Sequence, residues 1–162
     1  MASIPLRTLP AALALAVAIL VAASSPALAG GDWNDAGVKW MTFEKGMAAA
    51  KKEGRPVCLI VYTEWCPHCT NYSKFFHDPK IVAKAKQFVM IRIDQDKEKA
   101  VGGQFAPDGS YIPRTFFLSP AGVLDPALHA PRDQYRYFYG ENDPGILLDS
   151  MEQAAKKYPA RK

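Results

Sequence analysis

Three apolar runs in the middle of the chain have the pattern of buried β-strands. Residues 57–62, 88–94 and 115–118 consist mostly of β-branched, aromatic and other apolar side chains, without regular polar alternation. Such runs are typical of strands that are covered on both faces of a sheet. Residues 135–139 are rich in tyrosine and are expected to return to the same sheet, while the polar, glycine-rich stretch 95–110 predicts a long loop.

Helical periodicity surrounds these strands. Apolar positions recur every three or four residues over 40–53, and Gly54 is placed to end that helix. Helices are also expected over 67–76 and 80–87. Asp143 is a suitable N-cap for a last helix with proline at its first position. The alternation of helices and strands predicts a single α/β domain with a central sheet flanked by helices.

The first 29 residues have the layout of a secretory signal peptide. Arg7 precedes an apolar run at 11–23, and small residues lead up to Ala29. The run is shorter than the roughly 20 residues that a spanning helix needs, so cleavage after Ala29 is favoured over a membrane anchor. The expected divisions are a signal peptide at 1–29, an N-terminal arm at 30–39 and a domain at 40–162.

The distribution of charge argues against one class of partner. The chain of 162 residues has a formal charge of +4, and its basic residues are scattered in pairs such as 51–52 and 156–157. A nucleic-acid surface ordinarily gathers its basic residues on one face. We therefore expect no nucleic-acid partner. No second long apolar stretch follows the signal, so no stable membrane anchor is expected once the signal is cleaved.

Two of the three cysteines, Cys66 and Cys69, lie where the first strand ends and a helix begins. A helix N-terminus favours the reactive thiolate, because its free N–H groups and the helix dipole stabilise an anion. Cys66 is therefore the expected nucleophile, and Cys69, one turn further on, is the expected resolving thiol. Their redox-active disulfide is expected to act without a cofactor or a metal. Cys58 lies inside an apolar strand and is interpreted as a core residue.

The two residues between the cysteines bear on the direction of exchange. A protonated His68 adds positive charge near the thiolate, and Pro67 removes a backbone donor and stiffens the loop. A stabilised thiolate favours the reduced form and makes the disulfide a better oxidant. The motif therefore favours an oxidase or isomerase over a reductase.

Other uses of the cysteine pair stay open. Haem attachment requires a histidine directly after Cys69, where Thr70 stands. A copper or zinc site could use both cysteines with His68 or His77, although no second cysteine pair completes it. A purely structural disulfide is the remaining alternative, and the position at a helix start suits turnover better.

The order of the motifs resembles the thioredoxin superfamily. A strand, Trp-Cys-Pro-His-Cys at 65–69, a helix, a strand and a later Ile112-Pro113 carry this resemblance. It implies a thioredoxin-like fold with a mixed sheet, and a cis peptide bond before Pro113. It also implies that the backbone of Ile112 pairs with an extended substrate beside Cys66. The expected substrate-binding residues are Trp65, Pro67, Ile112 and Pro113.

A more specific string lies at 105–114. Its Pro-Asp-Gly-Ser-Tyr-Ile-Pro-Arg resembles the anterior-gradient and small endoplasmic-reticulum thioredoxin-like proteins, and the resemblance extends over residues 40–158. It implies a secretory-pathway protein that acts on cysteine-containing protein substrates, and a redox-recycling partner whose identity stays open. The Cys-Pro-His-Cys motif instead resembles the bacterial periplasmic disulfide oxidases. Because residues 159–162 are Pro-Ala-Arg-Lys rather than a retention signal, we expect the bacterial periplasm, with secretion or a secretory-pathway lumen as alternatives.

The chain departs from thioredoxins at their proton relay. Thioredoxins carry a buried acid six residues before the first cysteine and a lysine on the next strand, and Ile60 and Met90 occupy these positions here. The proton acceptor for Cys69 is therefore open, with Glu64 acting through water as one candidate.

The first hypothesis is an exported thiol–disulfide oxidoreductase, and the motif favours oxidase or isomerase activity. A reductase of the same fold is the nearest alternative. A non-catalytic chaperone or binding module that uses the same groove, and a metal-delivery protein, are alternatives from other classes.

Overall fold

A four-stranded mixed sheet forms the centre of the protein, of which the computed structural model describes residues 30–160. The strand order is β1-β3-β2-β4. Strands β1, β3 and β2 are parallel, and β4 runs antiparallel to β2, as the thioredoxin-like resemblance implies. The strands are β1 (Trp40–Met41), β2 (Val57–Tyr62), β3 (Val89–Asp94) and β4 (Arg114–Leu118). The expected signal peptide lies outside the described residues.

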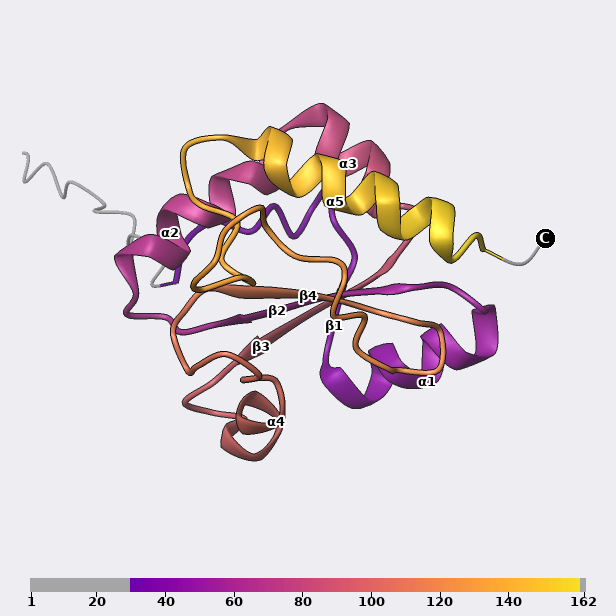
Figure 1. Ribbon diagram of the computed structural model, residues 1–162, viewed down its shortest axis with the longest axis horizontal. Helices are drawn as coiled ribbons and strands as arrows, with labels where there is room; N and C mark the ends of the chain where they lie inside the picture. Colours follow the sequence, from indigo (N-terminus) through magenta and orange to yellow (C-terminus); the bar gives the residue numbers. More distant parts are fainter. Residues whose placement is uncertain (1–29, 161–162) are drawn as a thin grey trace, which may run out of the picture.

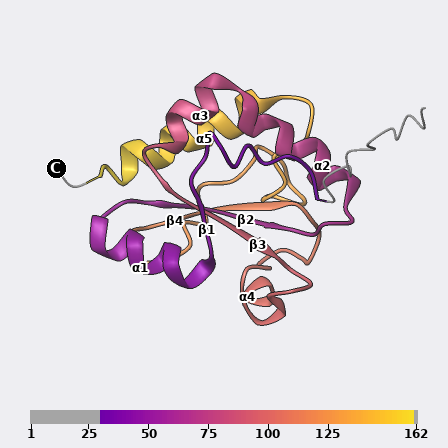
Figure 2. The ribbon, with the colours of Figure 1, turned by 180° about the vertical axis from the view of Figure 1, so that it is seen from behind.

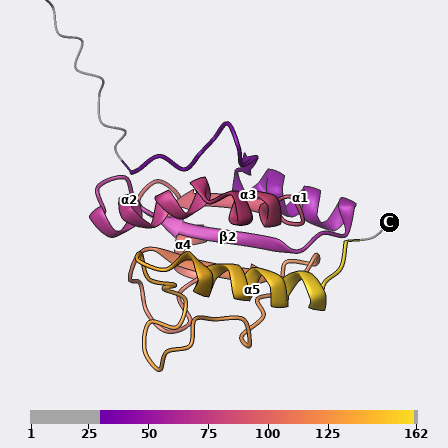
Figure 3. The same ribbon diagram turned by 90° about the horizontal axis from the view of Figure 1, so that it is seen from above.

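Helices cover both faces of the sheet (Figure 1 and, from behind, Figure 2). One face carries α2 (Pro67–Ser73), the 3-10 turn η1 (Lys74–His77), α3 (Pro79–Ala85) and α5 (Pro144–Lys157). The other carries α1 (Phe43–Glu53) and α4 (Lys99–Gln104). From above, α2 and α3 follow one side of β2 and α5 follows the other (Figure 3).

The position of β2 at the centre of the sheet, between two layers of helices, explains why its sequence is continuously apolar. Its first five residues are fully buried. Cys58 and Ile60 face the core beneath α2, α3 and α5, whereas Val57, Leu59 and Val61 face the core beneath α1. Both faces of the strand therefore lie away from water, as expected for a strand with helices on either side.

The first helix begins three residues later than its periodicity predicts, at Phe43 rather than at residue 40. Trp40–Met41 form the edge strand β1 instead, where Trp40 pairs with Met90 and its indole N–H donates to the carbonyl oxygen of Trp33 at 2.8 Å. A tertiary contact therefore outweighs the local helical pattern at these positions. Gly54 ends the helix with a left-handed φ of 64°, which confirms the predicted stop.

Two other predictions of local structure are wrong in part. The expected loop 95–110 contains the short helix α4, whose weak amphipathic pattern includes two glycines. Residues 135–139 do not form a strand. They lie against the edge of β4, where Thr115 donates its backbone N–H to the carbonyl oxygen of Tyr137 at 2.8 Å. The other predicted strands and helices each begin within one residue of the expected position.

The N-terminal arm packs against the sheet and α2. Trp33 is only 3% exposed, and its indole N–H donates to the carbonyl oxygen of Gly30 at 2.6 Å. The Trp33 ring contacts the rings of Trp40 and Phe76, at centroid distances of 5.9 and 5.6 Å. The Arg92 guanidinium lies 5.5 Å from the Trp33 ring centroid. The arm is therefore part of the hydrophobic core.

A buried arginine holds the segment that leads into β4. Arg114 is fully buried, and burial lowers its pKa. Its guanidinium donates to the carbonyl oxygens of Phe105 at 2.9 Å, Gly102 at 3.2 Å and Tyr111, and to the side-chain oxygen of Gln95 at 2.7 Å. All four acceptors are neutral, so Arg114 acts as a hydrogen-bonding clamp between α4 and the segment before β4.

Replacement of Trp33 tests the role of the arm. Trp33→Ala is expected to lower the free energy of unfolding by about 3–5 kcal/mol, because it removes a large buried ring. Urea unfolding measures the change. Val123→Ala, at an apolar side chain that is 64% exposed, is the control and should change stability by less than about 0.5 kcal/mol. Similar losses in the two variants would contradict a structural role for the arm.

Replacement of Arg114 tests the clamp. Arg114→Lys keeps the charge but cannot reach all four acceptors, so buried carbonyl groups lose their partners. We expect a loss of about 2–5 kcal/mol in the free energy of unfolding. The control is Arg132→Lys, because Arg132 is exposed and donates to the Phe138 carbonyl oxygen at 2.9 Å. Equal stability of Arg114→Lys and the unchanged protein would show that the clamp is dispensable.

Candidate functional site

Cys66 caps the helix that follows β2. Its backbone is extended, with φ −83° and ψ 116°, and Pro67 occupies the first helical position. The Cys66 Sγ accepts the backbone N–H of Cys69 at 3.4 Å. The sulfur therefore takes the role of an N-cap oxygen and faces the free N–H groups at the start of α2.

The segment before β4 lies opposite this cap. The Ile112–Pro113 peptide bond is cis, as the resemblance to thioredoxins implies. The Cys66 Sγ lies 4.0 Å from the carbonyl oxygen of Ile112. The structure therefore brings Cys66, Cys69 and Ile112–Pro113 together, although 46 positions separate Cys66 from Ile112.

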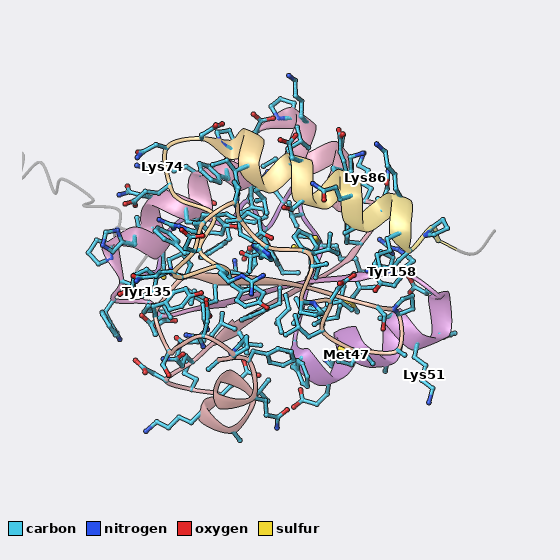
Figure 4. The ribbon with its side chains drawn as sticks, in the orientation of Figure 1. Met47, Lys51, Lys74, Lys86, Tyr135 and Tyr158 are labelled. Carbon is cyan, nitrogen blue, oxygen red and sulfur yellow. The ribbon has the colours of Figure 1, made fainter. Side chains whose placement is uncertain are left out.

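Trp65 stands at the open edge of this site. Its side chain is 70% exposed, and its indole N–H donates to the Asp96 carboxylate at 2.7 Å. Tyr135, at 52% exposure, lies at the same end of the molecule as α2 (Figure 4). The Tyr135 ring meets the ring of Tyr111 edge to face at a centroid distance of 4.9 Å, next to Ile112. Exposed aromatic surface therefore flanks the cysteines.

The hydrogen-bond partner of His68 is an acid from a distant loop. His68 Nδ1 lies 2.8 Å from the Glu141 carboxylate, on the segment before α5. Burial acts to raise the pKa of Glu141, but the hydrogen bond with His68 helps to hold that pKa below its usual range. The charge of a protonated His68 is thus partly compensated before it can act on Cys66.

Cys69 and Cys58 are fully buried thiols. Burial raises the pKa of both thiols well above the usual range. A backbone hydrogen bond from Thr63 to Cys69 acts in the opposite direction but is outweighed. Ile60 and Met90 are also buried, so the two positions of the thioredoxin proton relay lie in an apolar environment.

Two charged residues of the site could not be recognised from the sequence. Glu141 is 73 positions away from His68 in the sequence. Arg114 directly follows the cis Ile112–Pro113 pair. Neither has a local pattern that indicates its partner. Arg114 is part of the family-like string at 105–114, but that string does not indicate what the arginine side chain does. Glu64, the acid considered as a proton acceptor, is paired with Lys97.

The other histidine considered as a ligand lies elsewhere. His77 Nε2 is 3.3 Å from the Asp32 carboxylate of the N-terminal arm. Within residues 30–160, no group of three or more histidine, cysteine or acidic side chains is arranged to hold a metal ion. In the same part of the chain, no helix is sufficiently long and apolar to cross a membrane.

Known proteins resemble this chain at the level of sequence. The family model described as Thioredoxin-like matches residues 39–120, about half of the chain. Anterior gradient protein 2 homolog of Homo sapiens is 28% identical over 125 residues, covering 76% of this chain and 70% of the relative. Anterior gradient protein 2 of Xenopus tropicalis is 29% identical over 124 residues, covering 75% and 73%.

Solved structures share the fold. A thioredoxin from Thermus thermophilus matches with a TM-score of 0.57 at 18% identity, covering 76% of this chain and 91% of the other. The DsbH oxidoreductase matches with a TM-score of 0.53 at 14% identity, covering 86% and 95%. The chain belongs to the thioredoxin-like family and is a thiol–disulfide oxidoreductase, and its cysteine pair at the start of α2 fits a Cys-x-x-Cys site.

Proposed function

We propose that Cys66 and Cys69 exchange disulfides with cysteine-containing proteins, with Cys66 as nucleophile and Cys69 as resolving thiol. The position of the Cys66 sulfur carries this proposal. It accepts an N–H group of α2, lies 4.0 Å from the Ile112 carbonyl oxygen and belongs to a residue that is 4% exposed, whereas Cys69 is fully buried. An incoming sulfur atom can therefore reach Cys66 more readily than Cys69.

The exchange proceeds through a mixed disulfide. A substrate thiolate attacks Cys66 Sγ of the oxidised protein, the Cys66–Cys69 bond breaks, and Cys69 leaves with the electron pair and takes up a proton. A second substrate thiolate then attacks the substrate sulfur of the mixed disulfide, and Cys66 leaves as a thiolate. The substrate has lost two electrons and the protein has gained them. A redox partner restores the Cys66–Cys69 disulfide, and the reverse sequence reduces a substrate.

The substrate surface is proposed to consist of Trp65, Pro67 and Ile112–Pro113. Ile112 is only partly buried, and its carbonyl oxygen lies 4.0 Å from the Cys66 sulfur, which supports pairing with an extended polypeptide. The exposed ring of Trp65 offers apolar area beside the same sulfur. This arrangement favours unfolded or flexible proteins as substrates, because a cysteine must be presented in an extended segment.

The proposed direction is oxidation or isomerisation, and the proposed location is outside the cytoplasm. A protonated His68 at the start of α2 favours the thiolate of the reduced form. The charged, apolar and small-residue segments of 1–29 support export, with the bacterial periplasm as the proposed compartment and secretion or a secretory lumen as alternatives. Equilibration with glutathione measures the reduction potential, and a value near about −270 mV, as in thioredoxin, would favour a reductase.

A second candidate function is binding of unfolded chains without exchange. The exposed rings of Trp65 and Tyr135 on either side of the site favour it. Replacing the cysteines separates the two functions, because a binding module does not need a nucleophile.

Cysteine variants test the proposed exchange. Cys66→Ser is expected to abolish insulin reduction and disulfide transfer, and Cys69→Ser to accumulate the mixed disulfide, since it lacks the resolving thiol. Non-reducing gels and mass spectrometry detect that species. Cys58→Ala is the matched control and should retain exchange, because Cys58 is buried in the core. Undiminished handling of unfolded clients by Cys66→Ser would favour the binding module.

The buried thiols also predict how stability depends on pH. An unfolded cysteine loses its proton above about pH 8.5, whereas Cys58 and Cys69 keep theirs in the folded protein because burial raises their pKa. The unfolded state then binds fewer protons, so stability falls as pH rises, with a slope for each thiol that approaches about 1.4 kcal/mol per pH unit well above pH 8.5.

Urea unfolding of the reduced protein from pH 8.5 to 9.5 measures this slope. Cys58→Ala should lose about half of it. Oxidation to the Cys66–Cys69 disulfide should remove the contribution of Cys69. Identical slopes for reduced and oxidised protein would contradict a buried, protonated Cys69.

A further inference from the structure

The ion pair between His68 and Glu141 connects two parts of the chain that lie far apart in the sequence. His68 is on the first turn of α2, two residues after Cys66, and Glu141 lies on the segment that leads into α5. The distance from His68 Nδ1 to the carboxylate is 2.8 Å. The Glu141 side chain is only 20% exposed, whereas the His68 side chain is 63% exposed. The acid is therefore fixed in place, and it determines where the imidazole ring lies.

The surroundings of the pair contain few other charges. Lys74 follows α2 and donates to the Asn71 side chain at 3.0 Å. Arg132 lies 5.2 Å from the Phe138 ring centroid, and that ring is 6.4 Å from the His68 ring. The Lys74 charge and a hydrogen bond with Asn71 also help to lower the pKa of Glu141. The acid in direct contact with His68 is Glu141.

The pair contributes charge at the first turn of α2, which Cys66 caps. A protonated imidazole alone would place one positive charge beside the sulfur and favour its thiolate. With Glu141 ionised, the charges of the pair sum to zero, and the thiolate gains less from the imidazole. Since a stabilised thiolate makes a disulfide more oxidising, the acid must weaken the oxidising strength that the motif alone implies.

We propose that Glu141 is a positioning residue that holds His68 and compensates its charge, so that the Cys66–Cys69 disulfide is a moderate oxidant rather than a strong one. The proposal rests on the proposed exchange reaction and deepens it. A moderate oxidant can donate its disulfide to a substrate and can also be oxidised again by a substrate disulfide. Both steps are needed for the isomerisation of substrates that already contain disulfides.

Glu141→Gln tests the proposal, because glutamine keeps the shape and can hydrogen bond but carries no charge. At pH 5.5, below the range in which histidine ordinarily titrates, the variant should be more oxidising. We expect its equilibrium constant with glutathione to shift about threefold to tenfold toward the reduced protein. The absorbance titration of the Cys66 thiolate should move to lower pH. The difference should shrink near neutral pH, where loss of the acid also releases the imidazole proton.

A double variant provides the matched control. His68→Gln alone leaves Glu141 unopposed and should be less oxidising than the unchanged protein. His68→Gln combined with Glu141→Gln restores a net charge of zero and should return the equilibrium constant to within about twofold of the unchanged value. Glu152→Gln, on α5 with a side chain that is 46% exposed, should change neither measurement.

Three results would overturn the proposal. They are an unchanged potential in Glu141→Gln, a shift toward a weaker oxidant, or a loss of thermal stability with no change in the thiolate titration. The thiolate titration needs no substrate. Failure of the unchanged protein to exchange disulfides would therefore reject the proposed function and leave the measurement on Glu141 intact.

Discussion

The arrangement of the active-site end depends on a buried cation without a buried acid beside it. Arg114 satisfies its guanidinium with three carbonyl groups and one amide, which belong to α4 and to the segments on either side of it. Neutral acceptors solvate a charge less well than a carboxylate does, so each of the four bonds is needed. These bonds fix residue 114 from several directions at once, directly after Ile112–Pro113.

The two site cysteines have different environments because of how α2 meets the sheet. Cys66 occupies the cap, where N–H groups face it, and Cys69 lies one turn further in, against the apolar core. Apolar side chains at Ile60 and Met90 leave no acid–base group at the two positions of the thioredoxin proton relay. Burial raises the pKa of this second thiol and so favours its protonated form in the reduced protein.

Much of the fold could be predicted because its strongest signals are local. Strands β2, β3 and β4 have apolar runs, and Gly54 and Asp143 have the chemistry of helix ends. The edge strand β1 and the segment 135–139 could not be placed, since partners distant in the sequence decide their conformation. At the site, Ile112–Pro113 came from a family resemblance, and its role stays a prediction. Glu141 was missed because an exposed-looking acid before a helix has no pattern that indicates a histidine.

The packing of the arm has a practical consequence for work with the protein. Gly30 has a positive φ of 88°, and a Cβ atom there would lie 3.0 Å from the Glu64 Cα, two residues before Cys66. A dye, tag or surface tether attached at Gly30 would therefore lie near Glu64, at the end of β2 that leads to the cysteines. Tyr158, just after α5, lies at the far end of the molecule (Figure 4). Attachment at that end leaves the approach to the sulfur atoms open.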